Sequence, residues 1–135
     1  MTRDTQEQVI IFPAGTAANG SSVAKEMQSY WHVYIEVVTT GFSGTIKFQC
    51  SDQEAGAPDL SGVQGATGAA NAWDYVQVKK LTNNTSIDGA TGVPYVTATG
   101  IERYEFNQNG GRWYGATISG YAAGSIQVKF KGYGT

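Results

Sequence analysis

The side chains that could carry chemistry in this chain are few and lie far apart. His32 is the single histidine and Cys50 the single cysteine among 135 residues. His32 falls on the polar face of an expected strand, and neither a triad-like frame nor a Gly-x-Ser-x-Gly turn accompanies it. Cys50 falls on the apolar face of the next expected strand, where a cysteine behaves as a small hydrophobic residue. We therefore expect no catalytic residue and no enzymatic activity.

Carboxylates gather in two long segments that lack a regular period. Asp52, Glu54 and Asp59 follow one expected strand, and Asp88 lies in the second such segment. Paired carboxylates serve glycosidases or bind calcium, but the run DQEAGAPD does not have the ligand spacing of a calcium loop. The glycine-rich run GATGAANA does not connect a strand to a helix, so it is not a phosphate loop. We expect solvated loops, with no metal and no cofactor.

The composition excludes several classes of partner. The net charge is −2 and the pI is about 5.2, so there is no basic excess to attract nucleic acid. No stretch approaches the roughly 18 apolar residues of a membrane span. A single cysteine allows no internal disulfide, and the first residues lack the apolar core of a signal peptide. These features predict synthesis in a host cytoplasm and no binding to membranes or nucleic acid.

Alternating apolar residues predict that strands position all of these groups. Residues 29–40 place Trp31, Val33, Ile35 and Val37 on one face, which indicates the core side. Further inward-facing sets are predicted in the later strands: Ile46, Phe48 and Cys50; Val76 and Val78; Tyr104 and Phe106; and Ile126, Val128 and Phe130.

Turn residues separate these strands. Gly41 and Gly44 predict a hairpin between residues 29–40 and 44–51, and residues 109–111 (NGG) predict another hairpin turn. No stretch of ten residues has a convincing helical period. The expected fold class is all-β, an antiparallel β-sandwich (jelly-roll or Ig-like) of about eight strands, with residues 1–8 as a flexible N-terminal arm and residues 9–135 as a single domain.

The tryptophans have three possible roles, namely packing between the sheets, assembly contacts or stacking on sugars. Trp31 shares a face with apolar residues, which favours the core. Trp113 and Tyr114 are neighbours in one strand, so they must point to opposite faces.

Four segments resemble the small β-sandwich virion structural proteins of tailed bacteriophages. They are FSGTIKFQCSDQ, AWDYVQVKKL, IDGATGV and RWYGATISGYAAGSIQVKFKGY. Within this group the chain is most like a capsid decoration (cement) protein. The resemblance implies a homo-oligomer, commonly a trimer, that binds the major capsid protein at the outer surface of the virion and braces neighbouring capsomers.

Other roles stay open at this point. The chain could instead belong to a neck, a tail or a fibre base, or it could be a carbohydrate- or receptor-binding module. A small hydrolase would require its carboxylates to converge in a pocket. The side chains expected to contact neighbouring subunits are Arg3, Asp4, Gln6, Asp59, Leu60, Val63, Trp73, Ile87, Trp113 and Tyr114.

Overall fold

A computed structural model of the chain describes residues 6–52, 73–107 and 111–134. This part of the chain is built from β-strands and connecting segments, without a helix, as the alternation of apolar residues predicted. The strands are β1 (Gln6–Thr16), β2 (Gly20–Ser21), β3 (Lys25–Glu26), β4 (His32–Ser51), β5 (Asp74–Tyr75), β6 (Val78–Lys80), β7 (Ser86–Ile87), β8 (Val93–Phe106) and β9 (Trp113–Tyr133).

All strand pairs are antiparallel, and they join in the order β1-β9-β4-β8-β6-β7. Strands β2 and β3 pair with the first half of β9, and β5 pairs with the end of β4. The two central strands, β4 and β9, are paired along almost their whole length, from His32 opposite Tyr133 to Ser51 opposite Trp113.

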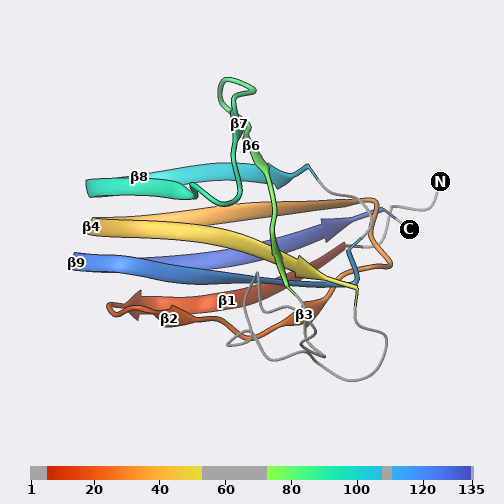
Figure 1. The fold of residues 1–135 in the computed structure, drawn as a ribbon, viewed down its shortest axis with the longest axis horizontal. Helices are drawn as coiled ribbons and strands as arrows, with labels where there is room; N and C mark the ends of the chain where they lie inside the picture. Colours follow the sequence, from red (N-terminus) through yellow and green to blue (C-terminus); the bar gives the residue numbers. More distant parts are fainter. Residues whose placement is uncertain (1–5, 53–72, 108–110, 135) are drawn as a thin grey trace.

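The three long strands β4, β8 and β9 bend at matching positions, and this bend makes the sandwich. The register between β4 and β9 shifts between Thr40 and Thr45, and the register between β4 and β8 shifts beside it. In Figure 1 these strands reach the same end of the molecule and turn back there. The sheet is thereby folded over itself into two layers, which confirms the expected antiparallel β-sandwich.

We call the two halves the first and second layers. The first layer contains β1, residues 32–40 of β4, residues 100–106 of β8, residues 125–133 of β9, and β6 with β7. The second layer contains β2, β3, β5 and the other halves of β4, β8 and β9.

The hairpin predicted at Gly41 and Gly44 was wrong in its geometry. Residues 32–51 form one strand that passes from the first layer to the second, and its two halves face each other across the core instead of pairing as neighbours. Gly41 has a φ of 57° and Gly124 a φ of 76°. A Cβ on Gly124 would overlap the backbone carbonyl of Gly41, so the bends of β4 and β9 pack directly against each other.

Aromatic rings from both layers fill the core. Phe48 of the second layer lies 5.8 Å from Phe106 and 6.3 Å from both Tyr104 and Phe130 of the first layer, measured between ring centroids. The inward-facing residues predicted for the later strands are all buried. Alternation therefore identified most of the core correctly.

Three positions depart from the expectations. Trp31 is 67% exposed, because the strand begins only at His32 and the tryptophan lies in the preceding turn beside Gly134. Gln49 and Ser51 alternate with the inward-facing Phe48 and Cys50, so alternation places them on the opposite face, yet both are buried. The Gln49 carbonyl accepts a hydrogen bond of 2.6 Å from the Thr117 hydroxyl on the neighbouring strand.

The beginning of the domain also differs from the predicted boundary. Residues 6–8, assigned to the N-terminal arm from the sequence, belong to β1 and pair with residues 131–133 of β9. The turn predicted at residues 109–111 falls largely outside the described residues.

Candidate functional site

The reactive side chains found in the sequence do not converge. His32 lies on the outer face of the first layer, where its Nδ1 is 3.1 Å from Glu105 Oε1, a partner that the sequence did not indicate. Cys50 points into the core from the second layer, where burial raises the pKa of its thiol to about 12, with Asp52 and Asp74 adding to the shift. The two side chains therefore face in different directions and form no nucleophile–base pair.

The acidic residues do not assemble into a site in the part of the chain that the structure describes. Asp52 is exposed, and Glu54 and Asp59 lie outside the described residues. One oxygen of Asp88 accepts hydrogen bonds from the Thr91 amide and hydroxyl, at 2.9 and 3.0 Å, and these bonds lower the pKa of Asp88. Among the described residues no three His, Cys, Asp or Glu side chains are arranged to hold a metal ion.

The predicted assembly contacts divide into four groups. Trp73 and Tyr114 are 1% and 2% exposed, so neither side chain is available at the surface of the isolated chain. Ile87 and Trp113 are half-buried, and Trp113 points away from the core while Tyr114 points into it, as their parity required. Gln6 begins β1. The remaining predicted contacts lie outside the described residues: Arg3, Asp4, Asp59, Leu60 and Val63.

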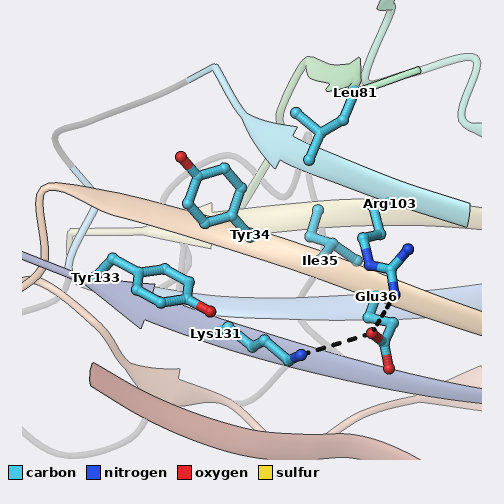
Figure 2. Close-up of a pocket in the computed structure, with 7 residues that line it drawn as sticks. All are labelled: Tyr34, Ile35, Glu36, Leu81, Arg103, Lys131 and Tyr133. Carbon is cyan, nitrogen blue, oxygen red and sulfur yellow. Dashed lines mark ion pairs between the residues drawn. The ribbon is translucent and has the colours of Figure 1, made fainter.

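A groove lies on the outer face of the first layer. It has a volume of about 250 Å³. Figure 2 shows its lining, with the two tyrosine rings at the left, Arg103 and Glu36 at the right, Lys131 below, and Leu81 at the top. The lining residues are Tyr34, Ile35, Glu36, Leu81, Arg103, Lys131 and Tyr133.

The strand register dictates this combination. Tyr34 and Glu36 alternate with buried Val33, Ile35 and Val37, so they must point outward from β4. Antiparallel pairing then brings Arg103 beside Glu36 on one side, and Lys131 beside Tyr34 on the other. Leu81 is held beside these residues by a backbone hydrogen bond of 3.0 Å, which its amide donates to the Arg103 carbonyl.

Glu36 is the centre of a small ion network. Its carboxylate lies 3.3 Å from Arg103, 3.5 Å from Lys131 and 3.8 Å from Lys129. The Glu36 side chain is 12% exposed, whereas Arg103 is 57% exposed. Cross-strand pairs of this kind stabilise a sheet modestly, and here three cations share a single carboxylate.

The tyrosines form the aromatic end of the groove. The rings of Tyr34 and Tyr133 meet edge to face, with centroids 5.3 Å apart and planes at 69°. Burial raises the pKa of Tyr34, and the negative charge of Glu105 adds to the shift. The Tyr34 hydroxyl therefore stays neutral near pH 7.

This groove combines several kinds of side chain that can take part in binding. Its lining has cations, a carboxylate, tyrosine hydroxyls and apolar surface. Sequence reasoning placed Tyr34 and Glu36 on an outward face but did not connect them to Arg103, Lys131 and Leu81. That connection depends on the pairing of β4 with both β8 and β9, which alternation within one strand does not specify.

The comparisons with known proteins bear on the fold. No protein-family model matches the chain, and no curated protein matches its sequence. The crystal structure of SPBc2 prophage-derived protein YomS is similar, with a TM-score of 0.70 and 11% sequence identity. The match covers 98% of this chain and 96% of YomS. At this identity the likeness shows a shared fold.

The secondary structure can also be compared with that of a membrane-spanning helix. In the described segments no helix has the length and apolar character needed to cross a bilayer.

Proposed function

We propose that the chain is a non-enzymatic structural protein of a tailed-phage virion, and that it decorates the outer shell of the capsid. The observation that carries this proposal is the likeness to YomS, a prophage-derived protein, over nearly the full length of both chains. The sequence resemblance to small virion sandwiches points the same way. The two arguments are independent, since one uses residue patterns and the other uses strand arrangement.

The distribution of reactive groups supports a binding role. Cys50 is held as a neutral thiol in the core, and His32 is paired with Glu105 on an outer face. The groove on the first layer is lined by charged and apolar side chains, which are suited to recognise a partner through charge and apolar contact. Such a surface suits a protein that acts by binding to other proteins.

Capsid decoration also suits a small β-sandwich that makes a small contact with each neighbouring protein. We propose the major capsid protein as the partner and a homo-oligomer, such as a trimer, as the bound form. Symmetry repeats each contact in an oligomer, so avidity holds the protein on the shell even if one interface is small.

Binding to particles tests this proposal. The purified chain would be mixed with particles of the encoding phage that lack it, and bound protein would be measured by co-sedimentation and located by cryo-electron microscopy. We expect saturable binding over the outer shell. Density confined to the neck, the tail or a fibre base would reject decoration, and a failure to bind any part of the particle would reject the virion role.

A carbohydrate-binding module is a second candidate, favoured by the exposure of Trp31. This ring is 67% exposed and lines a small cavity of about 230 Å³ with Gln28, Ser29 and Tyr30. An exposed indole is a suitable stacking surface for a sugar. A glycan array probed with the wild type and with Trp31→Ala decides this alternative, because sugar binding must be present in the first and lost in the second.

A further inference from the structure

We propose that the groove on the first layer binds an acidic segment of a partner protein. A carboxylate of that segment would lie between Arg103 and Lys131, and an adjacent apolar side chain would pack on Tyr34, Tyr133 and Leu81. The inference rests on the proposed function in one respect, namely that a virion protein must bind neighbouring proteins.

The charge of this face is opposite to that of the whole chain. In the described strands, the outward-facing positions of this layer carry four cations, Lys79, Arg103, Lys129 and Lys131, against two carboxylates, Glu36 and Glu105. With His32 neutral, this is a net charge of +2 on a protein whose overall net charge is −2. A partner carboxylate is therefore attracted to this face and repelled by the rest of the molecule.

The position of Glu36 leaves the cations able to accept a second anion. One carboxylate, 12% exposed, balances three cations beneath the groove. Arg103 is 57% exposed and Lys131 is 30% exposed, so both have donors that face outward. Figure 2 shows both side chains pointing toward Glu36, each joined to it by the dashed line of an ion pair.

The other lining residues have the composition of a protein-binding hot spot. Tyr and Arg, the residue types of Tyr34, Tyr133 and Arg103, are enriched among residues that dominate interface energies. Leu81, which is 42% exposed, adds apolar surface beside them. A volume of about 250 Å³ is below the usual range for a cofactor pocket, roughly 300–1,000 Å³. The groove is therefore of a size to take one or two side chains.

The geometry of the rings favours a protein segment over an acidic sugar. A sugar ring stacks on a flat aromatic face, whereas Tyr34 and Tyr133 meet at 69° and form no continuous platform. Two inclined rings instead form a notch that fits a branched or aromatic side chain.

A peptide titration tests the inference without any phage particle. The ¹⁵N-labelled chain would be titrated with acetyl-Glu-Leu-Glu-Leu-amide, and the same experiment would use acetyl-Gln-Leu-Gln-Leu-amide and sodium glucuronate. We expect the acidic peptide to shift the amide signals of Tyr34, Leu81 and Arg103, with a dissociation constant on the order of 1 mM, as befits a single small contact. The neutral peptide should bind at least about fivefold more weakly, since it lacks the charge.

Charge variants identify the groups responsible. Arg103→Gln combined with Lys131→Gln should abolish the shifts, and Arg103→Lys should retain most of them. Lys25→Gln combined with Lys47→Gln is the matched control, because both lysines lie on the second layer, Lys25 on β3 and Lys47 over the Tyr75 ring, and their loss also removes two positive charges. Thermal unfolding of each variant checks that the fold is intact.

Glu36→Gln distinguishes a binding role from a structural one. If the network only stabilises the sheet, the variant gains no affinity. If the cations bind an acidic segment, removing the competing carboxylate should tighten peptide binding by about fivefold. Unchanged or weaker binding by Glu36→Gln, equal binding of the neutral peptide, or glucuronate binding in place of the peptide would each overturn the inference. None of these results depends on whether the chain is found in virions.

Discussion

At the scale of single residues, burial disfavours the charged forms of the ionisable groups in the core. The pKa of Cys50 and that of Tyr114 are both raised to about 12, chiefly by desolvation. The pKa values of Tyr95 and Tyr104 are also raised by burial, and their hydroxyls lie 2.8 Å apart. The buried position of Cys50 followed from alternation alone. The pairing of the two tyrosine hydroxyls did not, because it joins residues nine positions apart across the bend of β8.

These shifts predict how stability depends on pH. Each group is an acid whose anion is disfavoured in the folded state, so the unfolded chain loses its proton first. The stabilising effect is complete below the unfolded pKa values, 9.0 for Cys and 10.0 for Tyr, and is lost as the pH rises through them toward about 12. Urea unfolding should give a constant free energy between about pH 6 and pH 8, and a falling one above about pH 9.

The Cys50→Ala variant separates the contribution of the cysteine from that of the tyrosines to the loss of stability at alkaline pH. It should keep the part due to the tyrosines, with an onset nearer pH 10. A free energy of unfolding that stays flat up to about pH 11 in the wild type would contradict the buried, neutral state of these groups.

Phe48 connects the two layers, and its removal should be costly. Its ring contacts Tyr104, Phe106 and Phe130 across the core. Phe48→Ala should lower the free energy of unfolding by about 3–5 kcal/mol in urea titrations. Val96→Ala is the control, because Val96 is 84% exposed and its truncation should change stability by less than about 0.5 kcal/mol.

At the scale of elements, the bend of β4, β8 and β9 is the feature that sequence reasoning described least well. The glycines at 41 and 44 correctly indicate the place where the chain reverses. Two alternating segments flank them, and this pattern predicts a hairpin. Whether such halves pair as neighbours or face each other across a core depends on which other strands lie between them, and that information is not local.

The packing of this bend can be tested with two glycines of similar conformation. Gly124 and Gly120 have φ values of 76° and 62°. Around Gly120 a Cβ would meet no heavy atom within 4 Å, whereas at Gly124 it would overlap the Gly41 backbone. Gly120→Ala should cost about 1–2 kcal/mol, the conformational term alone, and Gly124→Ala should cost at least about 1–3 kcal/mol more.

Chemical unfolding of both variants provides the measurement. Equal losses at the two positions would mean that the bends of β4 and β9 are not in direct contact. A larger loss for Gly124→Ala, with an unchanged dependence on denaturant concentration, would support the folded-over sheet.

At the scale of the whole molecule, the all-β sandwich was predictable from composition and alternation. Eighteen glycines, eight tyrosines and few charges indicate many turns and half-buried strands. The groove was not predictable in the same way, since its residues come from β4, β8, β9 and the segment after β6. The exposure of Trp31 was missed for a local reason, because the strand begins at His32, three residues after the predicted start at residue 29.

The proposed virion role also belongs to this scale. The fold matches a prophage-derived protein over almost its whole length, and the groove on the first layer presents charged and apolar side chains. A decoration protein occupies positions set by the symmetry of the shell, so its copy number is large and fixed.

The most direct test of this account is the number of copies of the chain per purified phage particle, measured by quantitative mass spectrometry against the major capsid protein. We expect on the order of hundreds of copies, in a simple ratio to the capsid subunit. Absence from the particle would contradict a virion role, and a number that suffices only for a ring at the neck or tail would contradict capsid decoration.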